Sequence, residues 1–165
     1  MNRKISQVSL FEPLILENCK VQQLIQKFIN ICMIHGKKTQ SRAIVYKTFY
    51  CLANENLSMN VITHFVNAIE NVKPILEVRK VRISGTTQLV PSIIPKSRQE
   101  TLALRWILEG ALWRRRLTKK NISFDQSLSA EIQDASKKQG FARKKRDDLH
   151  KLAESNRSFS HYRWW

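Results

Sequence analysis

Apolar residues near the start of the chain predict an amphipathic helix over residues 21–32. They recur at the three- and four-residue spacing of one helix face, formed by Val21, Leu24, Ile25, Phe28, Ile29 and Cys32. Gly36 follows, and glycine is the residue type that best ends a helix in a left-handed conformation. Lys37 and Lys38 come next, so two cations are expected at this end of the helix.

The same spacing predicts two more helices. One covers about residues 40–54, with an apolar side made of Ile44, Val45, Thr48, Phe49 and Leu52. The next ends before Pro74, which cannot continue a helix, and carries Val61, Ile62, Phe65, Val66, Ile69 and Val72. Three such helices are expected to pack as a small bundle.

A β-hairpin is predicted where the helical spacing stops. Two strands, at 75–83 and 88–91, flank the glycine-containing segment 84–87. The apolar alternation changes phase between Val78 and Val81, so the outer half lacks one consistent buried face. We therefore expect the hairpin to project from the helical body.

Two capping boxes predict the next helix starts, because a serine and a glutamate or glutamine three residues later can satisfy each other's backbone N–H groups. The box Ser97–Glu100 opens a fourth helix, and Ser123–Gln126 opens a fifth that ends at Gly140. A sixth helix is predicted over about residues 144–155. The fold class is thus mainly α: one six-helix, bundle-like domain with a protruding β-hairpin between the third and fourth helices.

This pattern divides the chain into three parts. We expect a basic, irregular arm at 1–20, a helical domain at 21–156 with its hairpin at about 75–94, and an aromatic tail at 157–165. No run reaches the roughly 18 consecutive apolar residues of a membrane span. The N-terminus resembles neither a signal peptide nor a transit peptide, so we expect the protein to work where it is made.

Charge points to a polyanionic partner. The 165 residues hold 29 Lys and Arg against 13 Asp and Glu, a net charge of +16. Nucleic acid is the first expectation, since each phosphate contact releases counterions. An anionic membrane surface is less favoured, because the cations are spread along the chain rather than confined to one helix face. Three cysteines without paired spacing argue against a disulfide framework or zinc site.

Basic clusters are the candidate binding groups. A single surface lysine is usually just solvated, but together they predict polyanion binding: Lys37 and Lys38; Arg79, Lys80 and Arg82; Lys96, Arg98 and Arg105; Arg114, Arg115, Arg116, Lys119 and Lys120; and Arg143, Lys144, Lys145 and Arg146. The last cluster opens a predicted helix, where cations oppose the helix dipole. A structural role is therefore less favoured for that cluster.

No enzyme signature is present: the sequence lacks a glycine-rich phosphate loop, a His-Glu-x-x-His motif and a nucleophile elbow. The aromatic residues predict no single-strand stacking platform, and Trp106 and His64 fall on apolar helix faces, where structural roles are expected. The aromatic tail residues Tyr162, Trp164 and Trp165 could either fold onto the body or contact RNA or protein.

Several sequence blocks follow one another along nearly the whole chain: Phe28-Ile-Asn30 with Gly36-Lys-Lys38, Ala68 to Pro74, Glu77-Val-Arg79, Leu102 to Trp106, Lys144-Lys145, and the ending from Ala153 to Trp164. In this order they resemble the small-subunit ribosomal protein seven family, in its bacterial and organellar form. So many blocks at matching separations are far more specific than one short motif.

The resemblance implies a binding protein with no reaction and no cofactor. It would bind the 3′ major domain of small-subunit rRNA, start assembly of the subunit head, and contact neighbouring head and platform proteins, including the eleventh small-subunit protein. The residues assigned to rRNA are Arg3, Lys4, Lys37, Lys38, Lys73, Arg79, Lys80, Arg82, Lys96, Arg98, Arg105, Arg114, Arg115, Arg116, Lys119 and Lys120. Those assigned to the vicinity of exit-site tRNA and mRNA are Ser84, Gly85, Thr86, Thr87, Gln88, Arg143, Lys144, Lys145 and Arg146.

Some positions depart from the family pattern: Val81 stands where an arginine is usual, and Ser84-Gly85 replaces a paired glycine turn. Frequent Ile, Lys and Asn with only 4 Gly suit an AT-rich organelle genome, so we expect a mitochondrial ribosome, with a plastid or bacterium as the alternative. Two other functions are weighed. A basic DNA- or RNA-binding protein outside the ribosome would share the charge. A nuclease would need Asp147 and Asp148 to bind magnesium, but these residues stand among cations and are more simply local charge partners, so we expect no cleavage.

Overall fold

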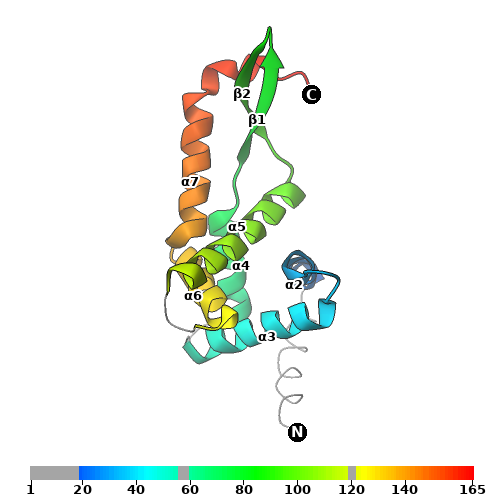
Figure 1. Ribbon diagram of the computed structural model, residues 1–165, viewed down its shortest axis with the longest axis vertical. Coiled ribbons are helices and arrows are strands. Elements are labelled where there is room, and N and C mark those ends of the chain that lie inside the picture. The colour runs from blue at the N-terminus through cyan, green and yellow to red at the C-terminus, as the bar shows by residue number, and fades with distance from the viewer. Residues whose placement is uncertain (1–18, 56–59, 119–121) are drawn as a thin grey trace.

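The structure, a computed structural model, describes residues 19–55, 60–118 and 122–165. Within these ranges the elements, in chain order, are the helices α2 (Cys19–Cys32), α3 (Lys38–Glu55) and α4 (Val61–Val72), the strands β1 (Leu76–Ile83) and β2 (Thr86–Ile93), the helices α5 (Lys96–Leu117), α6 (Phe124–Ser136) and α7 (Gly140–Ser155), and the 3₁₀ helix η1 (Arg157–Tyr162) (Figure 1). This confirms a mainly helical fold with a hairpin between the third and fourth helices. Residues 1–18 of the predicted basic arm, which include the predicted site residues Arg3 and Lys4, lie outside the described residues, as do Lys119 and Lys120. Residues 19 and 20, which were also predicted to be irregular, begin α2 instead.

The core lies where α2 to α6 meet. Phe65 of α4 stands between Phe28 of α2 and Phe49 of α3, with ring centroids 5.4 and 5.3 Å away, and all three rings are buried. Leu104 and Ile107 of α5 complete the same cluster. Such aromatic pairs add about 0.5–1.5 kcal/mol each beyond the burial of their surface. In the described ranges, no helix is long and apolar enough to cross a membrane.

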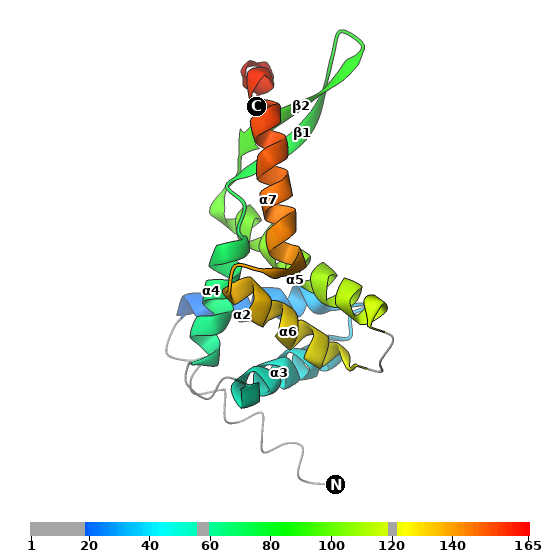
Figure 2. The same ribbon diagram turned by 90° about the vertical axis from the view of Figure 1, so that its left-hand side faces the viewer.

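The hairpin and α7 rise side by side from the helical body and make the molecule elongated, with the hairpin tip projecting outward (Figures 1 and 2). The antiparallel register runs from Leu76 opposite Ile93 to Ile83 opposite Thr86. Arg79 and Lys80 are both exposed, as the phase change predicted. The predicted projection of the hairpin is confirmed.

The hairpin turn is shorter than predicted. Ser84 and Gly85 both have positive φ, at 47° and 84°, so they are the two central residues, and Thr86 already belongs to β2. Two successive positive φ values match the right-handed twist of the strands. Serine pays some strain there that glycine does not.

One predicted capping box is wrong and the other is confirmed at its serine. The cap of α5 is Pro95, Ser97 lies inside the first turn, and the Glu100 carboxylate accepts a hydrogen bond from Lys27 Nζ at 3.0 Å. A tertiary ion pair has therefore taken the carboxylate that the local motif would use. At α6 the Ser123 hydroxyl accepts the N–H of Gln126 at 3.4 Å.

Two helix ends also differ from prediction. Gly36 (φ 72°) lies in the turn that joins α2 to α3 rather than at the end of α2. Helix α6 ends at Ser136, and Gly140 (φ 90°) is the first residue of α7 instead of the end of the preceding helix. Because glycine can occupy a left-handed conformation before as well as after a helix, residue type alone did not fix its place.

Candidate nucleic-acid interface

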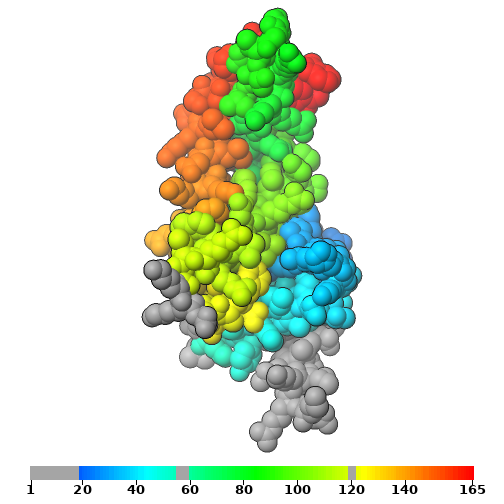
Figure 3. All heavy atoms as spheres, in the orientation of Figure 1, coloured from blue at the N-terminus to red at the C-terminus, as the bar shows by residue number. Residues whose placement is uncertain are grey.

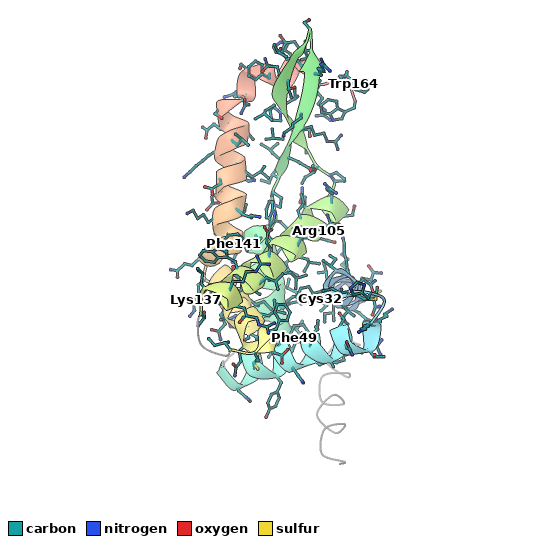
Figure 4. The ribbon with its side chains drawn as sticks, in the orientation of Figure 1. Cys32, Phe49, Arg105, Lys137, Phe141 and Trp164 are labelled. Carbon is teal, nitrogen blue, oxygen red and sulfur yellow. The ribbon has the colours of Figure 1, made fainter. Side chains whose placement is uncertain are left out.

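One set of predicted cations is exposed and takes no part in an ion pair within the described ranges. These side chains lie at the α2–α3 turn, on the hairpin and along α5: Lys37, Lys38, Lys80, Arg82, Lys96 and Arg105. Figure 3 shows the hairpin, α5 and the α2–α3 turn on one face of the molecule, and Figure 4 labels Arg105 on α5. We call this set the hairpin-side cations.

A second set lies where α5 ends and α7 begins. Arg115, Arg116 and Lys144 are exposed and likewise without an ion pair among the described residues. Lys137 and Lys138 are exposed in the α6–α7 turn and were not predicted (Figure 4 labels Lys137). The signal for them was a pair of adjacent lysines beyond the apolar stripe of α6. We call this set the foot cations.

Two other predicted site residues form ion pairs within the chain, and one of them holds the hairpin to α5. Arg98 Nη2 lies 2.9 Å from Glu77 Oε1 of β1, and this hydrogen bond raises the pKa of Arg98. Lys73 pairs with Glu70 at 2.5 Å and lies 4.0 Å from Glu100. Lys73 and Arg98 are therefore committed within the chain.

Arg114 joins α5 to α6. Its guanidinium donates to Glu131 Oε2 at 3.0 Å and to the carboxylate of Asp134. Glu131 is 1% exposed, and its other oxygen accepts the N–H of Ala142 at 3.0 Å. Burial lowers the pKa of Arg114, but the hydrogen bonds to Glu131 and Asp134 outweigh it and the pKa is raised. Arg114 is thus a structural cation, unlike its neighbours Arg115 and Arg116.

Arg143 and Arg146 close the end of α4. Arg143 Nη1 donates to the carbonyl of Asn71 at 2.7 Å, and Arg146 Nε donates to the carbonyl of Lys73 at 3.1 Å. The last carbonyls of a helix lack helical partners and carry the negative end of its dipole. The expectation that a structural role is disfavoured for this cluster is therefore wrong. These cations serve the end of another helix.

The rest of that cluster is divided. Lys145 Nζ lies 2.6 Å from Glu109 Oε2 of α5, whereas Lys144 has no ion pair in the described ranges. Asp147 pairs with Arg143 and Arg146, as expected for a local charge partner. No group of three metal-ligating side chains occurs among the residues that the structure describes.

The tail folds against the hairpin. Arg79 lies with its guanidinium carbon 5.3 Å from the ring centre of Trp165, and η1 packs on β2. Trp164 remains 81% exposed. Of the two alternatives for the tail, folding onto the body holds for Trp165. The tip residues Ser84, Gly85, Thr86 and Thr87 are exposed and Gln88 is half-buried.

His150 fastens the base of the hairpin to α7, since its Nε2 accepts the N–H of Ile75 at 3.2 Å. Burial, and then the charge of Arg146, lower the pKa of His150. His64 makes a contact of 3.3 Å to Ser136, and Trp106 is half-buried against the core, so the structural roles expected for both are confirmed.

Comparison with known proteins gives concordant matches. The family described as ribosomal protein S7p/S5e matches residues 3–157. Small ribosomal subunit protein uS7m of Marchantia polymorpha is 70% identical over 148 residues, which are 90% of this chain but only 63% of that protein. The uS7m of Triticum aestivum is 51% identical over 87% of this chain and 95% of its own length. The uS7 of Sulfurihydrogenibium sp. is 44% identical over 86% of this chain and 87% of its own length.

Proposed function

Because this chain belongs to the ribosomal protein S7p/S5e family and is a structural, non-enzymatic protein of the small ribosomal subunit, we propose that it is a primary binder of the 3′ major domain of the rRNA. In this role it nucleates assembly of the subunit head. The hairpin tip and α7 lie near exit-site tRNA and mRNA, and head and platform proteins, including the eleventh, are its neighbours.

The observation that carries the proposal is the set of hairpin-side cations. They are exposed, have no carboxylate partner among the described residues, and belong to three segments that Figure 3 shows on one face: the α2–α3 turn, the hairpin and α5. Phosphate contacts of this kind position a protein on RNA, while the shape of the RNA supplies most of the selectivity. Of the three hairpin cations, Lys80 and Arg82 are the best candidates for phosphate contacts, because the Arg79 guanidinium lies over the ring of Trp165.

The test is a salt-dependent competition titration of the full chain. A fragment of the small-subunit rRNA head competes with scrambled RNA of equal length and with duplex DNA. We expect strong preference for the head fragment. Replacing Lys80 and Arg82 together with Ala should make the slope of log K against log salt shallower by about 1.4–1.8 units, since each phosphate contact contributes roughly 0.7–0.9.

A charge-matched control removes two exposed cations outside the proposed surface, Lys47 of α3 and Lys151 of α7, by Ala substitution. This control should leave the slope nearly unchanged. Equal affinities for the head fragment, scrambled RNA and duplex DNA would contradict the proposal, because they would show only nonspecific electrostatic binding. Equal slopes for the two double variants would move the RNA surface away from the hairpin.

We also propose that this chain is encoded in the organelle and belongs to the mitochondrial ribosome. The identity to the uS7m relatives from Marchantia polymorpha and Triticum aestivum, 70% and 51%, exceeds the 44% and 42% to bacterial uS7 relatives. Cell fractionation followed by a density gradient checks this proposal. The chain should sediment with the mitochondrial small subunit, and sedimentation with a plastid subunit would contradict it.

A further inference from the structure

An aromatic pair lies between the end of α5 and the start of α7. Trp113 and Phe141 have ring centroids 5.3 Å apart and ring planes only 21° from parallel. Trp113 is 49% exposed, so much of the indole remains open to solvent. Figure 4 shows Phe141 at the foot of α7, next to α5. The two residues are far apart in sequence and meet only because α5 packs on α7.

A cavity of about 460 Å³ adjoins the pair, within the range of roughly 300–1,000 Å³ that is usual for small-molecule sites. It is lined by Trp113, Gly140, Phe141, Lys144, Lys145 and Asp148. The presence of both rings and two lysines in one wall combines an apolar face with positive charge. Asp148 is the one carboxylate in this lining, so an anionic group would be held on the lysine side.

Contacts within the chain hold the Phe141 side of this site in place. Lys145 pairs with Glu109 at 2.6 Å and its Nζ lies 5.3 Å from the centre of the Phe141 ring. The ring is therefore held both by stacking and by a cation that is itself anchored to α5. Lys144 is left as the available cation in the lining, and the exposed Arg115 and Arg116 come after Trp113 and Arg114 in the last turn of α5.

We propose that the exposed indole of Trp113, supported from behind by the Phe141 ring, stacks against an unpaired nucleobase of RNA, and that Lys144 contacts its phosphate. The site rests on the proposed function, because it extends RNA binding to the foot cations. Every base has a π face that stacks on an aromatic side chain, and unstacked bases are commonly held in this way. The unpaired foot cations favour a polyanion over an apolar protein segment as the occupant.

The test measures binding of the full chain to a single-stranded oligouridine and to an RNA duplex, as a function of salt. Trp113→Ala should weaken binding of the single strand about 5- to 150-fold, with an unchanged salt slope and unchanged duplex binding. Trp113→Phe should retain most of the affinity. Lys144→Ala should reduce the slope by about one unit. Leu112→Ala, which removes an adjacent exposed apolar side chain, is the matched control and should have no effect.

Cross-linking of the unaltered chain provides a second readout that does not depend on how a variant folds. With 5-bromouridine in the oligonucleotide, irradiation should give an adduct on the peptide that contains Trp113. Adducts on other peptides alone would refute the stacking site, as would equal affinities of Trp113→Ala and Leu112→Ala. If the unaltered chain bound neither the rRNA head fragment nor the oligouridine, the proposed function itself would fail.

Discussion

Gly110 offers a sharp test of the joint between α5, α6 and α7. It is buried within α5, where alanine would ordinarily be the better helix former by about 1 kcal/mol. A Cβ at this position, however, would stand 2.7 Å from Glu131 Oε1 and 2.8 Å from Glu131 Cδ. The outcome of Gly110→Ala therefore depends on whether that carboxylate can move.

The surroundings of Glu131 argue that it cannot move without loss. The side chain is 1% exposed, and its two oxygens bind Arg114 and the N–H of Ala142 at 3.0 Å each. Displacing one partner of a buried ion pair costs about 3–5 kcal/mol in the extreme, and overpacking alone about 1–3 kcal/mol. After the helical gain of about 1 kcal/mol is subtracted, we expect Gly110→Ala to lower the free energy of unfolding by up to about 4 kcal/mol.

Urea unfolding followed by helical circular dichroism measures this change. The control is the double-mutant cycle with Glu131→Ala: once the carboxylate is absent, Gly110→Ala should become neutral or stabilising, because only the helical preference remains. If Gly110→Ala stabilised the chain with Glu131 intact, the carboxylate would be free to swing away. The close-packed joint described here would then be wrong.

Three further outcomes are expected. Arg146→Ala should lower the free energy of unfolding by about 1–2 kcal/mol, because the carbonyl of Lys73 at the end of α4 loses its charged donor. Lys144→Ala should change the free energy of unfolding by less than about 0.5 kcal/mol, and urea titration distinguishes the two variants. Because the pKa of His150 is lowered on folding, the unfolded chain binds a proton more readily than the folded chain, so the stability present at neutral pH should fall as the pH drops through the ordinary histidine pKa. Hydrogen-exchange protection at the hairpin base should decrease over the same pH range. In the His150→Gln variant, this pH-dependent decrease should be absent. Burial raises the pKa of Cys32 to about 12, so iodoacetamide at mildly alkaline pH should modify the exposed Cys19 and leave Cys32 intact, as mass spectrometry can show; equal labelling would contradict the burial.

The regular parts of the fold follow from the sequence because they depend on periodicity. The apolar stripes of the first three helices match the buried positions, including Phe28, Phe49 and Phe65. Helix ends were less predictable, since a side chain that could cap a helix locally can instead form an ion pair with a residue distant in sequence. Glu100 is an example: its local motif suggests a cap, but Lys27 from a distant helix holds the carboxylate.

The basic clusters were predictable as a set but not residue by residue. Sequence treats Arg114, Arg115 and Arg116 alike, yet only packing decides that the first meets Glu131 and the others face solvent. The stacking of Trp113 on Phe141 was missed for the same reason, because a contact between two helices leaves no periodic signal. Local patterns supply the chemical groups, and tertiary packing decides their use.

The cations of the described residues divide into some that face solvent and some that hold the fold together. Three acidic residues form ion pairs where elements of the fold meet. Glu77 holds the hairpin to α5, and Glu131 holds α5 to α6 and α7. Asp147 pairs with the arginines that donate to the carbonyls at the end of α4. The Arg114–Glu131 pair is partly buried, and such pairs are screened by salt much less than exposed charges are. Under the proposed function, rising salt should therefore release RNA from the hairpin-side cations well before it loosens the joint at Glu131. The net charge of +16 overstates the phosphate-binding capacity, because part of the positive charge belongs to the scaffold.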